Sequence, residues 1–223
     1  MMHRALLRLA CFALMVAGAS PALAQADPAL AISDIVVAQA QGRPPARNQP
    51  TQKPAEQSLE NNVRKPVLDE LFERLAAAKD QEEADGIAGA IERVFQRSGS
   101  DTADLLMNRA LTAMHRKENA TAVDVLDKLV VVESEWAEAW AQRATARFID
   151  GDKVGAVEDL GHALSREPRH FGALAGLGSV LYSLGYEKRA LEVFRRALAV
   201  RPHQAEVKQM IDKLAPDVDG RDI

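Results

Sequence analysis

The residue types that carry most chemistry in proteins are sparse in this chain of 223 residues. Neither an HExxH stretch nor another close histidine pair occurs, so the histidines predict no metal site. Each is expected to be a surface or packing residue. The histidines beyond residue 24 are His115, His162, His170 and His203.

The acidic residues also fail to form a catalytic pair. Glu82-Glu83 and Glu158-Asp159 are consecutive, so on a helix the two carboxylates of each pair point to different sides. Both pairs are interpreted as parts of solvated helix faces. A Gly-rich phosphate loop and a GxSxG nucleophile motif are lacking too. The sequence therefore predicts no catalytic residues, no cofactor and no bound metal.

The first residues have the three parts of a secretory signal peptide. Arg4 and Arg8 give a positive start, and Leu9 to Ala19 is a short apolar run. Ala22–Ala24 supplies the small-residue cleavage pattern, so residues 1–24 are expected to be removed. The alternative is an uncleaved anchor, but the run is short against the roughly 20 residues that span a bilayer. No second apolar run of spanning length follows.

The only cysteine, Cys11, lies inside this segment. A lipoprotein signal would acylate it, but Arg8 stands where such a signal requires an apolar residue. Cleavage after Ala24 leaves a mature chain without a thiol, which excludes disulfides and thiolate metal sites. The form of the signal predicts export to a bacterial periplasm.

Composition and charge bear on the class of partner and on the order of the chain. The formal net charge is -4 and no run of Lys and Arg occurs, so no nucleic-acid partner is expected. Residues 25–64 are predicted to be a disordered, Pro/Gln-rich linker, because Gln39 to Asn62 nearly lacks large apolar side chains. This linker is interpreted as a tether, with a proline-rich ligand for a partner as the alternative. Within it, Ala29 to Ala38 is an apolar island.

Helical periodicity begins after the linker. Residues 65–102 are predicted to be an N-terminal helix pair, either an irregular repeat or a cap, with Pro66 in the first turn and a stop at Gly99. The apolar positions recur every three or four residues, as on one face of a helix. They are Leu68, Leu71, Phe72 and Leu75 in the first helix, and Ile87, Ile91, Val94 and Phe95 in the second.

The rest of the chain repeats itself every 34 residues. One register divides it into three units, 103–136, 137–170 and 171–204, followed by a final helix that ends near Leu214. Small residues recur where two helices press together, and Gly and Pro recur where the chain turns. The matched pairs are Ala156 and Ala190, Ala163 and Ala197, Gly151 and Gly185, and Pro168 and Pro202.

This repeat resembles the tetratricopeptide repeat (TPR), a helix-turn-helix of 34 residues. The second and third units match several signature positions at once, whereas the first has Leu129 and Ser134 in place of the expected small residue and Pro. The resemblance implies an all-α fold, an α-solenoid of antiparallel helix pairs. The final helix would cap the stack over 103–214, and 215–223 are predicted to be a flexible tail.

The resemblance also implies a concave groove lined by the first helix of each unit. Such positions include Glu138, but almost no basic residue, so a clamp for a terminal carboxylate is not expected. An apolar helix or extended peptide would fit better. In the alternative, these side chains pack against the N-terminal helix pair and fill the groove. The candidate partner-binding residues are Met107, Asn108, Leu111, Met114, His115, Gln142, Thr145, Phe148, Ser179 and Tyr182.

Three segments are similar to exported, periplasmic TPR proteins of alphaproteobacteria. They are Leu68 to Ala78, Asp104 to Met107 and His170 to Gly178. The resemblance implies a protein-binding scaffold or adaptor, with a role in cell-envelope assembly or integrity. A self-associating structural scaffold, a homo-oligomer, is the alternative, and a peptidoglycan-directed enzyme or protease is a third class that no residue constellation favours.

Overall fold

The structure is a computed structural model that describes residues 54–220, with side chains from residue 64 onward. All regular structure in that range is helical. The predicted signal peptide and the apolar island lie outside the described residues. The helices are α2 (Pro54–Ala76), α3 (Gln81–Phe95), α4 (Asp101–His115), α5 (Asn119–Val132), α6 (Ala137–Asp150), α7 (Lys153–Arg166), α8 (Phe171–Ser183), α9 (Glu187–Val200) and α10 (Ala205–Asp219).

Local signals set where these helices begin and end. The Asp80, Ser100 and Asp152 side chains accept hydrogen bonds from backbone N–H groups of the first turns of α3, α4 and α7. Gly151 lies in the turn between α6 and α7, and Gly185 lies in the turn between α8 and α9. Their φ angles are 96° and 85°, in a region that residues with a side chain rarely adopt.

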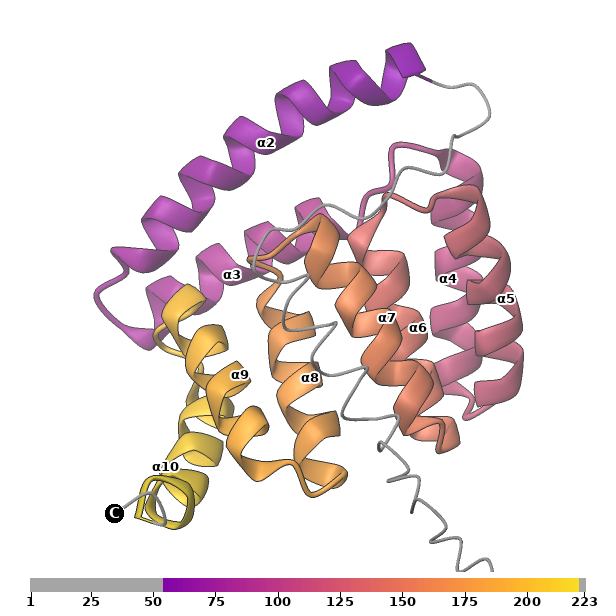
Figure 1. Ribbon diagram of the computed structural model, residues 1–223. Coiled ribbons are helices and arrows are strands. Elements are labelled where there is room, and N and C mark those ends of the chain that lie inside the picture. Colours follow the sequence, from indigo (N-terminus) through magenta and orange to yellow (C-terminus); the bar gives the residue numbers. More distant parts are fainter. Residues whose placement is uncertain (1–53, 221–223) are drawn as a thin grey trace, which may run out of the picture.

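Helices α4 to α9 form three antiparallel pairs stacked side by side, and α10 covers the last pair (Figure 1). The predicted all-α solenoid of antiparallel helix pairs is confirmed. The pairs can approach closely because Ala156, Ala163, Ala190 and Ala197 are fully buried between them. Large side chains such as Phe194 fill the spaces between these contacts.

Two predicted boundaries are wrong. Helix α2 begins at Pro54 and runs through Pro66, so the linker does not extend to residue 64 and Pro66 is not in a first turn. Ala, Gln, Glu, Lys and Leu between residues 55 and 65 are good helix formers and carry the helix past the proline. Helix α10 continues to Asp219 because Val218 is buried against the core, so residues 215–219 are not a flexible tail.

The N-terminal hairpin, α2 with α3, does not stack on α4 as a further repeat. It lies across one edge of the array, where the chain passes from each helix pair to the next (Figure 1). Its apolar face packs on Phe171 of α8 and Val200 of α9. The hairpin is therefore not a cap on the first unit.

Candidate binding groove

Helix α3 crosses the inter-repeat junctions, which are residues 133–136, 167–170 and 201–204. At its C-terminal end the Phe95 carbonyl accepts a hydrogen bond of 2.7 Å from Trp136 Nε1, and the Phe95 ring stacks on His170 at 4.5 Å. At the opposite end Arg201 pairs with Asp85 at 2.6 Å. The hairpin thus connects residues of all the helix pairs along one edge.

A groove lies between α6 and α8, the first helices of the second and third units, and α3 borders its junction end. Its volume is about 410 Å³. Leu160 of α7 contributes to its floor, and the α8 wall carries no side chain at Gly172 and Gly176. The lining residues are Glu92, Gln96, Glu138, Ala141, Gln142, Ala144, Thr145, Phe148, Leu160, His170, Phe171, Gly172, Ala173, Gly176, Ser179 and Val180.

Glu138 is the most unusual of these residues, because its side chain is only 8% exposed and yet carries a carboxylate. His170 Nε2 lies 2.9 Å from Glu138 Oε2, and Gln142 Nε2 donates to Oε1 at 2.6 Å. Burial alone would raise the pKa of Glu138, but the hydrogen bond from His170, supported by that from Gln142, outweighs it and lowers the pKa. The carboxylate is therefore ionised at neutral pH.

His170 is held in one neutral tautomer by its own place in the chain. Its Nδ1 accepts a hydrogen bond of 3.2 Å from the Ala173 backbone N–H at the start of α8. A nitrogen that accepts carries no proton, so the proton is on Nε2 and points to Glu138. His170 is buried, which agrees with the expectation that this histidine is a surface or packing residue.

The structure brings only some of the predicted groove residues together. Gln142, Thr145, Phe148 and Ser179 line the groove. Tyr182 lies on the same helix as Ser179, but its hydroxyl accepts a hydrogen bond of 2.8 Å from Lys213 of α10 instead.

The predicted residues of α4 lie elsewhere. Met107 is 4% exposed and belongs to the core of the first two units, so it is not available to a partner. Leu111 and Met114 are half-buried against that same core. Asn108 and His115 are exposed on α4, outside the groove.

The alternative of a groove filled by the N-terminal hairpin is not what the structure contains. The apolar side chains of α2 and α3 pack among themselves and on Phe171, while Glu92 and Gln96 of α3 only border the groove. The sequence did not indicate which residues of α3 would border the groove, because they fall outside the repeat register.

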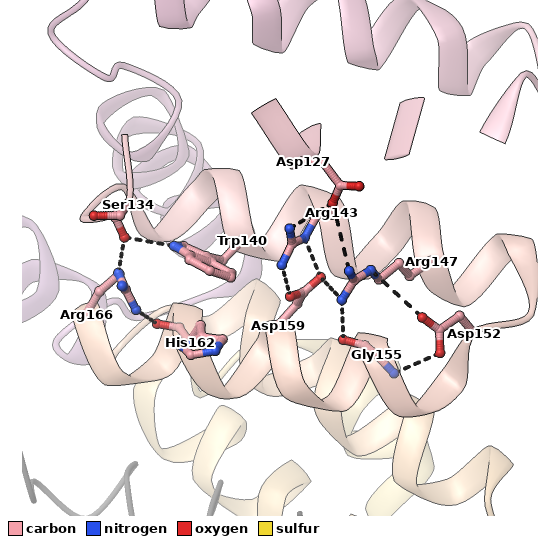
Figure 2. A network of polar contacts seen from close by, with 10 residues as sticks. All are labelled: Asp127, Ser134, Trp140, Arg143, Arg147, Asp152, Gly155, Asp159, His162 and Arg166. Carbon is pink, nitrogen blue, oxygen red and sulfur yellow. Dashed lines mark hydrogen bonds and ion pairs between the residues drawn. The ribbon is translucent and has the colours of Figure 1, made fainter. Parts of the chain in front are cut away.

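A polar network on the neighbouring helices was also missed (Figure 2). Asp159, predicted to be solvated, is 1% exposed in its side chain and forms two hydrogen bonds of 2.8 and 2.6 Å with Arg143. Arg143 also contacts Asp127 at 2.8 Å, and Arg147 contacts Asp159 at 3.1 Å. The network ties α5, α6 and α7 together behind the groove.

Trp140 extends this network towards the junction edge (Figure 2). Its ring lies between the guanidinium groups of Arg143 and Arg166, at 4.8 and 5.0 Å from the ring centroid, and contacts His162 at 4.3 Å. Partial burial and the charge of Arg166 lower the pKa of His162. His162 and Trp140 therefore serve packing, as expected for a repeat signature position and its neighbour.

Among residues 64–220, no three His, Cys, Asp or Glu side chains come close enough to hold a metal ion. None of the described helices is long and apolar enough to cross a membrane.

Similarity to known proteins places this arrangement in a family. A TPR repeat-containing protein of Rhizobium etli is 34% identical over 165 residues, which cover 74% of this chain and 81% of that protein. The chain belongs to the TPR family. No family model matches the sequence. The predicted resemblance to TPR proteins of alphaproteobacteria is thus confirmed as to family.

Solved structures agree on the fold of this TPR protein. The Sgt2 TPR domain from Aspergillus fumigatus has a TM-score of 0.52 at 20% identity, covering 55% of this chain and 83% of that domain. The protein MamA has a TM-score of 0.51 at 25% identity, covering 62% of this chain and 80% of that protein. The first TPR of Spaghetti (RPAP3), bound to the HSP90 peptide SRMEEVD, has a TM-score of 0.51 at 18% identity, covering 52% and 93%.

Proposed function

We propose that this TPR protein is an exported, periplasmic adaptor that binds a segment of another protein in the groove between α6 and α8. The groove is the observation that carries the proposal. It opens beside two first helices, it has an apolar floor at Ala144 and Leu160, and it offers the hydrogen-bonding groups of Gln142 and Thr145. Glu138 to Phe148 spans about 15 Å of helix, enough for a short peptide.

The lining argues against acidic peptides as ligands. The residues that surround the groove include Glu92 and Glu138 but no Lys or Arg. The related fold of Spaghetti (RPAP3) holds the peptide SRMEEVD, which supports peptide binding as a use of this architecture. Its acidic ligand would meet like charge here, and like charges in contact are repulsive.

The adaptor has no enzymatic step in this proposal. Glu138 and His170, the buried groove residues able to transfer protons, hydrogen-bond to each other and to the start of α8. Both are engaged in holding the groove end in place.

The export part of the proposal rests on residues 1–24 and the envelope role on the resemblance to exported TPR proteins. Fractionation of cells that express the full chain tests export. The chain is expected in the periplasmic fraction and in a shortened form that begins after Ala24. Recovery of the full-length chain with the cytosol would overturn it.

A crosslinking pull-down from the envelope fraction tests the groove. Met107→Glu is unsuitable as a probe, because Met107 is in the core. Thr145→Trp with Ser179→Trp blocks the groove at two exposed positions with neutral side chains. The control is Thr102→Trp with Thr121→Trp, also exposed and outside the groove. Partners retained by the control and lost by the blocked variant support the proposal, and equal retention by both contradicts it.

Self-association is the second candidate, and exposed apolar side chains on the first unit favour it. Leu105 on α4 and Val131 and Val132 on α5 are 69%, 80% and 60% exposed. Sedimentation at rising concentration distinguishes the two candidates: a dimer that Val131→Glu dissociates would support the scaffold, and a monomer at every concentration would exclude it.

A further inference from the structure

The charge of Glu138 has no cationic partner in direct contact. Its hydrogen-bond partners are His170 and Gln142, and His170 is neutral because its Nδ1 accepts from Ala173 N. No Lys or Arg in the described part of the chain lies within ion-pair distance of the Glu138 carboxylate. Arg64 acts on it only through space, and more weakly than the two hydrogen-bond partners.

A buried carboxylate is ordinarily neutralised by a bound cation or by a paired side chain. The network behind the groove follows that rule, because Asp159 has Arg143 and Arg147 in contact. Glu138 does not follow this rule, and it lines the groove. The missing counter-charge can therefore be supplied by whatever fills the groove.

A second carboxylate lines the groove at its junction end. Glu92 of α3 is this residue, and it forms a loose ion pair with Arg201 at 3.9 Å. Gln96 adds a neutral polar side chain at this end. A cationic group would find one buried and one exposed carboxylate within a single region.

Apolar side chains line the other end of the groove, away from α3. Phe148 and Val180 present apolar surface there, and Leu160 continues it along the floor. Gly172 and Gly176 have no side chains, so a ligand backbone can approach α8 closely at these two positions. The groove thus has carboxylates at the α3 end, and at the other end it has apolar side chains beside the hydroxyl groups of Thr145 and Ser179.

We propose that the groove selects a peptide segment of its partner that carries a lysine or arginine, with the cation at Glu138 and a large apolar residue against Phe148. This inference rests on the proposed adaptor function and specifies its ligand. An exposed carboxylate alone would attract cations weakly, but the low exposure of Glu138 makes a charge-assisted hydrogen bond to it strong and directional.

A random library of 12-residue peptides displayed on phage tests the proposal with the full chain as bait. Peptides that also bind the blocked variant, Thr145→Trp with Ser179→Trp, are discarded, and this step is unbiased for charge because both changes are neutral. The remaining peptides are expected to be enriched in Lys and Arg next to apolar residues. The best of them is then synthesised with its basic residue intact and with that residue replaced by glutamine, and both are measured by fluorescence anisotropy.

The basic peptide is expected to bind Glu138→Gln about tenfold more weakly than wild type, and the glutamine peptide to bind both proteins equally. Glu158→Gln, which removes an exposed carboxylate outside the groove, should leave affinity unchanged. Thermal unfolding checks that Glu138→Gln folds. If it does not, Glu92→Gln on exposed α3 takes its place, with a weakening of about threefold expected.

The outcomes separate the two proposals. If no peptide depends on the groove, the adaptor function itself falls. If groove-dependent peptides show no excess of Lys and Arg, or if affinity for the basic peptide survives both substitutions, the inference on charge falls while the adaptor function stands.

Discussion

At the scale of single residues, Asp159 is a buried charged residue in a sequence context that is typical of an exposed helix face. It stands beside Glu158 in the sequence, but only Glu158 is exposed. Both oxygens of Asp159 are used by Arg143, and Arg147 adds a third contact. Removing the carboxylate would leave two partly buried guanidinium groups with only Asp127 and Asp152 near them.

We therefore expect Asp159→Ala to lower the free energy of unfolding by about 3 kcal/mol. Urea denaturation followed by circular dichroism measures the loss. Glu158→Ala is the matched control, with a change within about 0.5 kcal/mol because the side chain is exposed. Equal effects of the two substitutions would contradict the structural role given to Asp159.

The buried carboxylate of Glu138 makes a prediction on pH. Its pKa in the folded protein is lowered from the ordinary value of 4.5, so the unfolded chain binds the proton more readily. The resulting stability is fully present above the unfolded pKa and is lost as pH falls below it. Wild type should lose more unfolding free energy between pH 7 and pH 3.5 than Glu138→Gln does. A parallel decline of both proteins in urea titrations at each pH would be the opposite result.

Sequence patterns identified residues of the repeat and missed residues whose role depends on a single distant partner. The small residues Ala156 and Ala190 were predictable because they recur at the repeat distance and are buried. Glu138 and His170 were not paired in the prediction, since 32 residues separate them and neither belongs to a motif. Phe148 and Ser179 line the groove, and the repeat register indicates which helix face they occupy.

At the scale of helices, the contact between α8 and α9 depends on the absence of a side chain at Gly178. A Cβ there would lie 2.6 Å from Phe194 Cε1 and 2.7 Å from Cδ1, closer than carbon atoms pack. Phe194 is 1% exposed and surrounded by core residues, so its ring has no free space to enter. The two helices would have to separate.

Gly178→Ala should accordingly destabilise the protein by about 1–3 kcal/mol, despite the better helix propensity of alanine. Gly86→Ala is the control, because Gly86 is exposed on α3 and nothing lies within 4 Å of the added carbon. It should stabilise by about 0.5–1 kcal/mol. Midpoints of thermal unfolding that move in opposite directions would agree with this geometry, and a stabilising Gly178→Ala would refute it.

A helix end could be predicted where a side chain caps the backbone. The predicted end was wrong where tertiary packing determines how far the helix continues. Ser100, a residue type that favours helix starts, caps α4 by accepting a hydrogen bond from Ala103 N. The end of α10 depends on Val218, whose burial against the last unit cannot be read from a polar tail sequence. Periodicity finds the interior of a helix, and tertiary contacts decide how far it continues.

At the scale of the whole molecule, the array was predictable and the position of the N-terminal hairpin was not. Repeat contacts join neighbours along the chain, so a 34-residue period is enough to deduce the stack. The hairpin instead contacts residues far away in sequence, as Asp69 does with Arg169 at 2.7 Å and Ala78 does with His203 at 3.1 Å. Such non-periodic pairs leave no local pattern.

Phe95 is the residue on which the docking of the hairpin depends most. It is 3% exposed, and its ring contacts Phe72 within the hairpin and His170 and Phe171 on the array. Its removal should release α2 and α3 from the junctions while the packing of α8 on α9 remains, because that contact has its own core. The hairpin would then open as a separate cooperative unit.

Hydrogen exchange measured by mass spectrometry tests this separation. In Phe95→Ala, peptides from α3 and from the junction at residues 167–170 should exchange about a hundredfold faster, as a loss of roughly 3 kcal/mol of local stability implies. Peptides from α9 should keep their protection. Arg93→Ala, an exposed change on the same helix, is the control and should leave both regions unchanged. Uniform acceleration throughout residues 64–220 would mean instead that hairpin and array unfold as one unit, and that the junction edge is part of a single core.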